Sequence, residues 1–451
     1  MTDPALFGDQ FAGESFAAWR ALLAGFYGLK LSKDELHYWR ELTGRESAPE
    51  AAHDELWMAI GRRGGKSQAA ALLAVFHACF IDYTDQLSPG EVATVLCLAA
   101  DRKQARAVFR YVTGLMNGNP MLQRLIMKET NETLELTNRT VIEVGTASFR
   151  STRGYTFAAV IADEIAFFRD SESANPDHEI LNAVRPGLAT LDGPLITLSS
   201  PYARRGALWD AHRRYFGKDG PILVAQAPTL TMNPTLPRRI VDQALERDPA
   251  AAASEYLAQF RDDISDFIAR DTVEAVTRPN PLVMPFDRKH KYFAFADPAG
   301  GGADEFCLAI GHLEDERIIV DCLLGRRGVP ADIVAEYAGV LRQYCISDIS
   351  ADRYAGSWPS DEFARHHIRV ETASKAKSDL YRDALATLNS GRCELPPDEK
   401  LINQLTSLER RTSRGGRDSI DHPPGGHDDR ANVVLGIIAN KSAPRKTAGV
   451  W

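Results

Sequence analysis

The chain has no long hydrophobic run. No segment approaches the ~18 consecutive apolar residues that a membrane-spanning helix requires. The N-terminus also lacks a basic patch followed by an apolar core, which is the pattern of a secretion signal. We therefore expect a protein that is neither secreted nor embedded in a membrane.

Cysteine is scarce, and its spacing forms no C-x-x-C pair, so neither a zinc site built on cysteines nor a disulfide framework is indicated. The six cysteines lie mostly in apolar stretches: Cys79, Cys97, Cys307, Cys322, Cys345 and Cys393. We expect reduced core thiols in a cytosolic compartment.

An excess of positive charge is also missing. Lysine and arginine number 53 against 61 aspartates and glutamates, and the formal net charge is -8. This excludes a protein that coats nucleic acid by bulk electrostatics, so any contact with DNA must be local. Local basic groups are present, although each alone is more typical of a solvated face: Arg102, Lys103, Arg106 and Arg110; Arg204 and Arg205; Arg213, Arg214 and Lys218; and Arg410, Arg411, Arg414 and Arg417.

What the chain does contain is a glycine-rich segment that ends in Gly-Lys-Ser. It comprises Gly61, Arg62, Arg63, Gly64, Gly65, Lys66 and Ser67. An apolar stretch precedes it and a helix-forming stretch follows, which is the context of a phosphate-binding loop. Lys66 can then reach the β and γ phosphates of a nucleotide, and the Ser67 hydroxyl can bind Mg²⁺. The strict pattern has glycine where Ile60 stands, with Gly61 one place late.

Two further strand ends support nucleotide hydrolysis. Residues 158–162 read as a buried parallel strand that ends in Asp163 and Glu164. The first carboxylate is placed to hold Mg²⁺ and the second to polarise the attacking water. Another apolar strand, residues 195–198, ends in hydroxyls and Pro201, as expected of an element that senses the γ-phosphate. Asp163 alone could be only a turn former or a helix cap.

The composition, 44% apolar and 25% charged, is typical of a globular chain of two or three domains. We predict an α/β fold, in which a P-loop NTPase sheet with helices on both faces precedes a ribonuclease-H-like mixed α/β domain. The expected parts are a helical lid at 1–50, the ATPase domain at 51–235, a helical connector at 236–290, the nuclease domain at 291–440 and a basic, mobile tail at 441–451.

Carboxylates stand at the ends of elements in the second domain. Asp297 ends its first strand, Asp352 follows its fourth, and Asp428 and Asp429 open its last helix. If the first and fourth strands are neighbours, these acids meet and form a site for Mg²⁺ or Mn²⁺, because clustered carboxylates need cations. Two such ions can cleave a phosphodiester.

Each of these acids also has a plainer interpretation. Asp297 could form a turn before Pro298, Asp352 could end a strand, and either late aspartate could cap a helix. Asp304 and His427 are secondary candidates for the same site, and His427 could equally be an ordinary loop histidine.

The order of these motifs resembles the large terminase subunit of tailed bacteriophages over residues 50 to 440. The motifs are the loop with two arginines, the Asp-Glu strand end, Leu-Ser-Ser-Pro, Asp-Pro-Ala-Gly-Gly and the late His-Asp-Asp. The resemblance implies an N-terminal ATPase that drives double-stranded DNA into a capsid and a C-terminal nuclease that cuts the concatemer.

The resemblance also implies roles for residues. Lys66 and Ser67 would bind phosphates and Mg²⁺, Asp163 would bind the ion and Glu164 would be the catalytic base. Arg62 lies where the family often has an arginine. Arg153, in the stretch from Ser148 to Gly154, would be an arginine finger acting on a neighbouring subunit, or else would form a salt bridge.

In the second domain the resemblance makes Asp297, Asp352 and Asp428 or Asp429 the nuclease ligands. The family often has a further aspartate where this chain has Asn432, which leaves open which of the two late aspartates faces the metal. Residues 197–201 would couple hydrolysis to movement. Gly415 and Gly416, the expected tip of a hairpin between basic residues, could touch DNA or gate the nuclease, or form a plain surface turn.

The implied cofactors are ATP with Mg²⁺, and Mg²⁺ or Mn²⁺ for the nuclease. The implied partners are double-stranded DNA, the portal protein, the small terminase subunit and further copies in a ring, expected to be a pentamer, in the host cytoplasm. Two other hypotheses are a helicase or repair translocase with an inactive second domain, and a portal-docking component that binds nucleotide only structurally. A Glu164→Gln change would leave the function of such a docking component intact.

Overall fold

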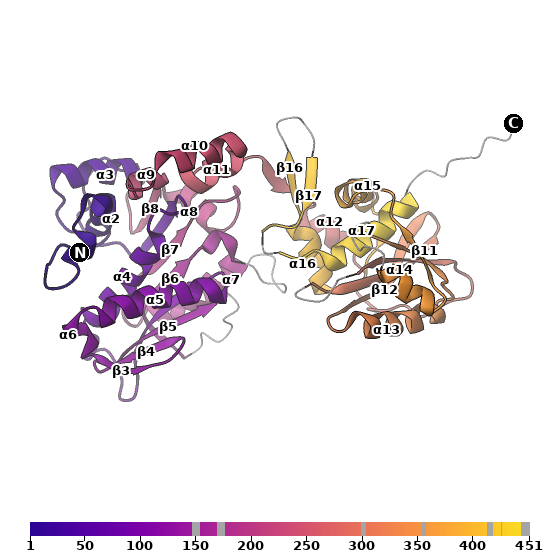
Figure 1. Ribbon diagram of the computed structural model, residues 1–451, viewed down its shortest axis with the longest axis horizontal. Helices are drawn as coiled ribbons and strands as arrows, with labels where there is room; N and C mark the ends of the chain where they lie inside the picture. The colour runs from indigo at the N-terminus through magenta and orange to yellow at the C-terminus, as the bar shows by residue number, and fades with distance from the viewer. Residues whose placement is uncertain are drawn as a thin grey trace. The chain divides into compact units, whose positions relative to one another are not determined.

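Two sheets, one in each half of the chain, organise the structure. A computed structural model describes residues 1–146, 154–168, 176–298, 304–352, 358–412, 418–424 and 426–442 (Figure 1). The described residues divide into two units, with the boundary between Asp262 and Asp263. The predicted fold class is confirmed, because a large, mostly parallel sheet is followed by a second, mixed sheet.

The first unit is built on an eight-stranded sheet of order β3-β4-β5-β2-β6-β7-β1-β8. Its long apolar runs pair in parallel, and only β3 and β4 are antiparallel additions at one edge. The strands are β1 (Glu55–Ile60), β2 (Ala93–Ala99), β3 (Ile126–Glu129), β4 (Thr133–Leu136), β5 (Thr140–Thr146), β6 (Thr156–Asp163), β7 (Leu195–Ser199) and β8 (Ile222–Ala227).

Helices cover both faces of this sheet, because alternate side chains of each strand point to opposite sides. In β1, Leu56 and Met58 enter a core with α4 and α5, whereas Trp57 enters a core with α7 and α8. The helices are α1 (Gly8–Phe11), η1 (Glu14–Phe16), α2 (Ala17–Phe26), α3 (Lys33–Thr43), α4 (Lys66–Cys79), α5 (Arg102–Asn117), α6 (Pro120–Gln123), η2 (Ile165–Phe167), α7 (Pro176–Leu188), α8 (Ala207–Tyr215), α9 (Thr229–Met232), α10 (Arg238–Arg247) and α11 (Pro249–Leu257).

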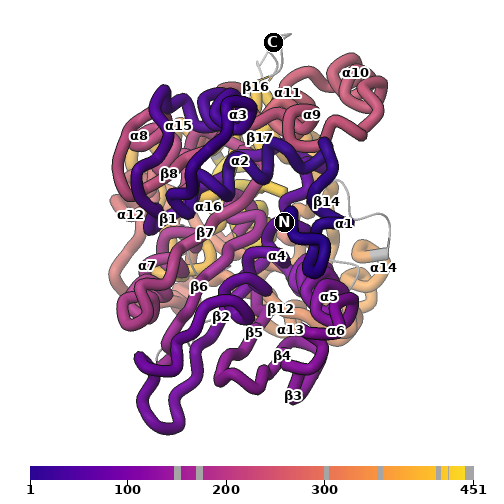
Figure 2. The backbone as a smooth tube through the Cα atoms, turned by 90° about the vertical axis from the view of Figure 1, so that its left-hand side faces the viewer, coloured from indigo at the N-terminus to yellow at the C-terminus, as the bar shows by residue number. Residues whose placement is uncertain are grey.

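The N-terminal segment is helical, and α3 lies beside β8 in both views of the backbone (Figures 1 and 2). The α3 helix begins with a capping box, in which the Ser32 hydroxyl accepts from the Glu35 N–H and the Glu35 carboxylate accepts from the Ser32 N–H. Gly25 allows α2 to lie directly on Trp39, since a Cβ at Gly25 would stand 2.3 Å from the indole ring. The α2–α3 pair is therefore tightly packed.

The second unit is built on a six-stranded sheet of order β14-β13-β10-β11-β12-β15. β10, β11 and β12 form an antiparallel meander, and β13 pairs in parallel with β10, as the ribonuclease-H-like prediction required. The strands of the unit, including a separate three-stranded sheet of β9, β16 and β17, are β9 (Ile264–Asp266), β10 (Tyr292–Asp297), β11 (Phe306–Glu314), β12 (Arg317–Arg326), β13 (Asp348–Ala351), β14 (Arg369–Thr372), β15 (Cys393–Glu394), β16 (Glu409–Thr412) and β17 (Asp418–Asp421).

Helices cover both faces of the second sheet as well. Phe295 enters a core with α15 and α17, whereas its neighbours Ala294 and Ala296 enter a core with α13. The helices are α12 (Arg270–Ala275), α13 (Pro330–Gln343), α14 (Trp358–Arg365), α15 (Lys377–Asn389), α16 (Glu399–Ser407) and α17 (Asp429–Ser442).

The cysteine prediction needs one correction. Four cysteines are buried and Cys79 is partly buried, but Cys345 is exposed, because it follows the last turn of α13 with a positive φ of 56°. All six are free thiols. No helix in the described part of the chain combines the length and the apolar character needed to cross a bilayer.

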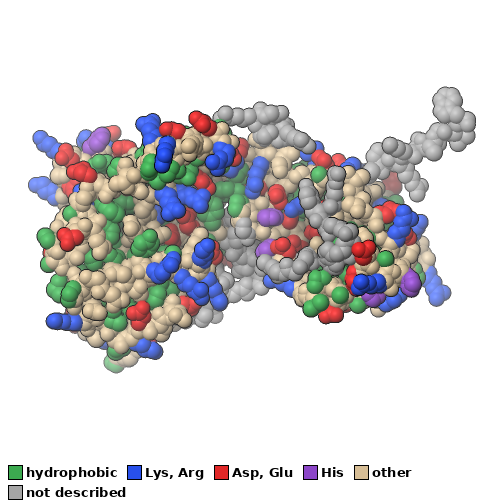
Figure 3. Space-filling model, in the orientation of Figure 1, with side chains coloured by type: hydrophobic (Ala, Val, Ile, Leu, Met, Phe, Trp, Pro, Cys, Tyr) green, Lys and Arg blue, Asp and Glu red, His purple; other side chains and the backbone are tan. Residues whose placement is uncertain are grey.

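The exposed basic side chains form small groups between acidic and apolar ones on the face drawn in Figure 3. On α5 the four basic residues Arg102, Lys103, Arg106 and Arg110 are exposed, and the opposite side of that helix enters the core. The basic charge on this face is therefore divided into local groups.

Candidate nucleotide and metal sites

The glycine-rich loop connects β1 to α4, and Lys66 is the first residue of that helix. Arg63 and Gly65 have positive φ values of 66° and 91°, so the backbone turns sharply just before the helix begins. Such alternating backbone conformations turn successive N–H groups toward one side and form an anion-binding concavity. The local structure is the strand, turn and helix that the sequence predicts.

Steric contacts explain why Gly61 stands one place later than the glycine of the strict pattern. A Cβ at Gly61 would lie 2.3 Å from Thr229 Oγ1, so no larger residue fits there. The preceding Ile60 is fully buried as the last residue of β1. The glycine is thus needed one place later than in the strict pattern, because the strand continues through Ile60.

Three side chains fix the loop by donating to its carbonyl groups. The pairs are Trp19 Nε1 to Gly64 O at 2.9 Å, Thr229 Oγ1 to Arg62 O at 2.8 Å and Asn233 Nδ2 to Arg63 O at 2.9 Å. These bonds pair three of the loop's carbonyl groups with side chains outside the loop. Among the described residues, the N–H groups of Gly65, Lys66 and Ser67 have no hydrogen-bond partner. The loop therefore offers three free donors at a helix N-terminus, the arrangement that suits phosphate.

The Lys66 ammonium is buried and joins three parts of the site. It donates to Ile60 O at 3.2 Å and to Ser200 Oγ at 2.9 Å, and it lies 3.4 Å from Glu164 Oε1. Only 6% of this lysine is exposed. The loop, the end of β6 and the end of β7 are thus linked through one positive charge.

Asp163 and Ser67 meet beside this lysine. Ser67 Oγ donates to Asp163 Oδ2 at 3.3 Å, while Asp163 Oδ1 is buried and has no partner among the described residues. Burial and, next, the charge of Glu164 raise the pKa of Asp163, against the opposing effect of Lys66. An unpartnered buried oxygen beside a hydroxyl is a set of donors that fits a hard divalent cation.

Glu164 is held in a strained backbone conformation, with φ 57° and ψ 43°. Its Oε2 accepts from the Ser199 hydroxyl at 3.1 Å and from the Ser200 N–H at 3.3 Å. Because β7 lies between β6 and β1, the end of β7 contacts the acid on one side and Lys66 on the other. These contacts orient the second carboxylate toward the loop.

The arginines of this site differ in their surroundings. Arg62 is exposed and forms an ion pair with Glu255 at 3.1 Å. Arg63 is exposed. Arg153, the predicted finger, lies outside the described residues.

The carboxylates of the second unit meet at one end of its sheet. Asp297 is the last residue of β10, and Asp352 follows β13, which pairs with β10. Asn432, on the first turns of α17, donates through Nδ2 to Asp297 Oδ2 at 2.8 Å and to Asp352 Oδ2 at 2.7 Å. Residues 135 and 80 positions apart in sequence are thereby joined by one amide.

This cluster has the properties of a cation site. Burial raises the pKa of Asp297 to about 7, together with the charges of Asp352, Asp429 and Asp428 and against the lowering effect of the hydrogen bond from Asn432. Asp352 Oδ1 and Asn432 Oδ1 are buried without a partner among the described residues. Such oxygens fit a hard divalent ion, which would neutralise the acids.

The two late aspartates have different partners. Asp428 is 5% exposed, and Lys377 Nζ lies 2.7 Å from its Oδ2, which also accepts from the Tyr381 hydroxyl at 2.8 Å. Although burial lowers the pKa of Lys377, the carboxylates of Asp428 and Asp421 raise it overall. Asp429 accepts the backbone N–H of Glu305, at 3.0 Å, and burial raises its pKa. Asp428 is therefore already neutralised by a cation of the chain, whereas Asp429 is bound by a neutral donor.

The secondary candidates lie next to Asp429. His427 Nδ1 and Asp304 Oδ1 are 3.0 Å apart. One ligand atom from each of these two residues and from Asp429 lies within 4.8 Å of the others.

The position of α17 depends on a glycine, because a Cβ at Gly436 would lie 2.8 Å from the ring of Phe295. The helix consequently lies directly against β10, two residues before Asp297.

Sequence reasoning misses three members of these sites. Lys377 and Tyr381 lie one turn apart on α15, and nothing in the sequence indicates that this helix faces Asp428. Asn432 stands out in the sequence only as a departure from a pattern. Its position four residues after Asp428, one helical turn on, is the available signal that it shares the face of the acids.

Comparisons with known proteins gave matches only among solved structures. No protein-family model matches the sequence, and no curated protein matches it. The large terminase of bacteriophage HK97 matches with 16% identity and a TM-score of 0.39, over 94% of this chain and 99% of that chain. The large terminase of a thermophilic bacteriophage matches with 11% identity and a TM-score of 0.39, over 90% of this chain and 97% of that chain.

The large terminase nuclease of the thermophilic phage G20c, solved with bound magnesium, matches with 18% identity and a TM-score of 0.33. It covers 38% of this chain and 95% of that chain. The family indicated by the order of motifs is the family of all three of these structures.

Proposed function

We propose that this chain is an ATP-driven DNA-packaging subunit that also cuts DNA by metal-dependent hydrolysis. One observation carries the proposal. The chain has a phosphate-binding loop that meets an Asp-Glu pair in one unit, and a separate buried carboxylate cluster in the other. The proposed ATPase domain is 51–235, and the proposed nuclease domain is 291–440.

In the ATPase, the free N–H groups of Gly65, Lys66 and Ser67 would bind phosphate oxygens, and the Lys66 ammonium would neutralise the transferring group. Ser67 and Asp163 would hold Mg²⁺, which supplies charge neutralisation on the phosphates when bound. Glu164 would accept a proton from the attacking water. The bonds from the end of β7 hold its carboxylate in place, which supports this role.

The end of β7 would also couple hydrolysis to movement. Ser200 contacts both Lys66 and, through its N–H, Glu164, so a change at either group reaches the segment after β7. This supports residues 197–201 as the coupling element. The predicted partner is double-stranded DNA, with the portal, the small subunit and further copies in a ring as the expected assembly.

In the nuclease, Asp297, Asp352 and Asp429 would hold one or two divalent ions, and Asn432 would keep the first two aligned. When bound, such ions activate water and stabilise the leaving oxygen of a phosphodiester. We assign Asp428 a positioning role, because its oxygens already bind Lys377 and Tyr381. Asp429 keeps an oxygen available for a ligand.

The test measures plasmid cleavage and ATP hydrolysis on the same samples of full-length protein, in Mg²⁺, in Mn²⁺ and in EDTA. We expect Lys66→Ala to lower ATPase by about 100-fold or more and to retain Mn²⁺-dependent nicking. Asp297→Asn should lose nicking and retain ATPase. Matched controls are the exposed Lys128→Ala and Asp348→Asn, the latter at the other end of β13.

Each outcome has a clear meaning. Unchanged cutting in Asp297→Asn would refute the assigned nuclease site. ATPase without cutting under any metal would instead support a translocase with an inactive second domain. Loss of both activities in a folded Lys66→Ala variant would refute the separation of the two sites.

A further inference from the structure

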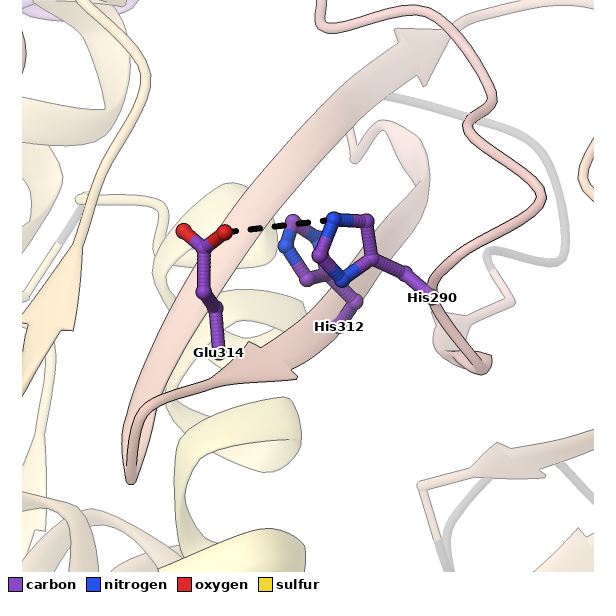
Figure 4. A group of neighbouring side chains, drawn as sticks. All are labelled: His290, His312 and Glu314. Carbon is purple, nitrogen blue, oxygen red and sulfur yellow. Dashed lines mark ion pairs between the residues drawn. The ribbon is translucent and has the colours of Figure 1, made fainter.

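We propose a second metal site in the second unit, formed by His290, His312 and Glu314 and selective for a borderline transition ion such as Zn²⁺ or Co²⁺. Figure 4 shows the three side chains converging, with His290 from the loop before β10 and the other two from the end of β11. One ligand atom of each lies within 4.8 Å of the others.

This cluster is separate from the nuclease carboxylates. In the antiparallel pair of β10 and β11, Asp297 is opposite Cys307, whereas Tyr292 is opposite His312. The two positions are five residues apart along the strand, which corresponds to about 17 Å. His312 and Glu314 are two residues apart on β11 and therefore point to the same side of it.

His312 carries the strongest sign of a ligand. Its Nδ1 is 2.8 Å from Asp321 Oδ2, and the side chains of both residues are almost completely buried. Its Nε2 is buried and has no hydrogen-bond partner among the described residues. A carboxylate that holds one imidazole nitrogen while the other stays free is the usual support of a metal-binding histidine. A buried ion pair alone would not require the free nitrogen.

A β-bulge in the sheet places Asp321 for its contact with His312. Ile310 pairs with Cys322 and Gly311 pairs with Val320, so Asp321 is an extra residue on β12. Such bulges redirect a side chain. Gly311 permits the close approach at this point, because a Cβ there would be 2.5 Å from Ile319 O.

His290 and Glu314 complete the set from the solvent side. The rings of His290 and His312 are 4.0 Å apart between centroids, and His290 Nε2 is 3.9 Å from Glu314 Oε1. The side chains of His290 and Glu314 are 22% and 56% exposed, so small rotations can bring both to an ion held by His312. These rotations are enough to give metal–ligand bonds of about 2.0–2.2 Å.

The ligand types decide the class of ion. Imidazole nitrogens favour zinc, cobalt, nickel and copper, whereas Mg²⁺ and Mn²⁺ favour the oxygens of the nuclease cluster. Three protein ligands also leave one position of a tetrahedral ion open. The site joins the loop before β10 to the end of β11.

The experiment titrates the full-length chain with Co²⁺ in excess Mg²⁺, which occupies the oxygen sites. We expect one Co²⁺ per chain with the strong visible absorption of a four-coordinate ion, and one Zn²⁺ that displaces it. His290→Asn and Glu314→Gln, both at partly or fully exposed positions, should each weaken binding by about ten-fold or more. His366→Asn, at another partly exposed histidine of the unit, should bind as wild type does.

Two results would overturn the site: no tightly bound Co²⁺ in the wild type, or wild-type affinity in both ligand variants. Asp321→Asn, which keeps the shape of the side chain, should weaken binding by about 10-fold or more while thermal unfolding reports its folding. Unchanged Co²⁺ affinity in that variant would overturn the role of Asp321.

Discussion

At the scale of single residues, the second unit has an asparagine side chain, Asn432, between two aspartates. Asn432 donates to Asp297 and Asp352 with the same nitrogen, and its own oxygen has no partner among the described residues. An aspartate at this place would add a third negative charge to a buried pair. The amide instead partly offsets the repulsion, and it offers a neutral oxygen to a cation.

The unequal partners of the two late aspartates give one prediction. Asp429→Asn should lower nicking by about 100-fold or more and raise the Mn²⁺ concentration needed for half-maximal nicking, because a proposed ligand is lost. Asp428→Asn should mainly lower the midpoint of thermal unfolding, because Lys377 then loses a buried partner. Cleavage rates across a Mn²⁺ series and unfolding curves of both variants test this. The reverse pattern would assign the metal to Asp428.

The raised pKa of Asp297 gives a second prediction. An unfolded aspartate titrates near 3.9, and Asp297 in the folded chain titrates at about 7. Between these values the folded state binds more protons, so this residue makes the free energy of unfolding fall as the pH rises from about 4 to 7. In EDTA, Asp297→Asn should therefore be more stable than the wild type at pH 8 by about 1 kcal/mol or more, but not at pH 5.

Thermal unfolding at both pH values measures this difference, with Asp348→Asn as the control. Mn²⁺ should raise the unfolding midpoint of the wild type at pH 8 and have less effect at pH 5. A stability difference between wild type and Asp297→Asn that is equal at pH 5 and pH 8 would contradict the assignment.

At the scale of elements, the N-terminal helices support the nucleotide loop. Trp19 of α2 is fully buried, and its indole N–H binds Gly64 O. A Cβ at Gly65 would lie 3.1 Å from the same indole nitrogen, so the helix and the loop are in close contact. The α2 helix therefore supports the backbone to which we assign phosphate binding.

Trp19→Phe should raise the KM for ATP about five-fold and leave nicking unchanged, because one hydrogen bond that orients the loop, of about 1 kcal/mol, is removed. Trp39→Phe is the matched control. It removes a similar bond, from the indole to Ser47 O at 2.8 Å, away from the loop. ATPase kinetics and unfolding of both variants distinguish the cases. An equal KM change in the two would mean that only general stability matters.

The elements differ in how well the sequence predicts them. The long apolar run of β6 is predicted within two residues at each end, and the end of β10 is predicted at Asp297, because burial on both faces leaves a clear pattern. The sequence predicts a hairpin that turns at residues 415–416, which lie outside the described residues, and β16 and β17 pair on either side of that turn. The bounds of these two strands are not predicted, since their sequences, Glu-Arg-Arg-Thr and Asp-Ser-Ile-Asp, are polar. The strand order follows from chain connectivity only in part.

The sites follow the same division. Asp163 and Asp297 are correctly predicted at the carboxyl ends of their strands. Parallel strands place these ends on the same side of a sheet. The contact of Lys377 with Asp428 could not be predicted, since it depends on how α15 packs against the start of α17. Long-range packing of helices leaves no local pattern in a sequence.

At the scale of the whole molecule, the chain combines two proposed sites in two units, and the predicted Arg153 finger lies outside the described residues. That residue carries the prediction that ATPase depends on assembly. Arg153→Ala should lower ATPase by about 1,000-fold or more in assembled protein, where neighbouring subunits meet, and have little effect in dilute protein.

A mixing assay gives the sharper test of this prediction. Lys66→Ala subunits lack hydrolysis of their own but keep Arg153, so an excess of them should restore ATPase to Arg153→Ala subunits. Absence of rescue, together with an equal loss at every protein concentration, would place Arg153 in its own subunit's site or in a structural role.

The contact of Gly436 with Phe295 has a consequence for genetics. Any side chain at position 436 would move α17 away from β10 and so draw Asn432 away from Asp297, although position 436 has no chemical group to contribute. The proposed function then predicts that Gly436 substitutions appear beside the aspartates in a screen for mutants that fill capsids but leave DNA uncut. Such mutants should be suppressed by smaller residues at Phe295, which no change at a true metal ligand would allow.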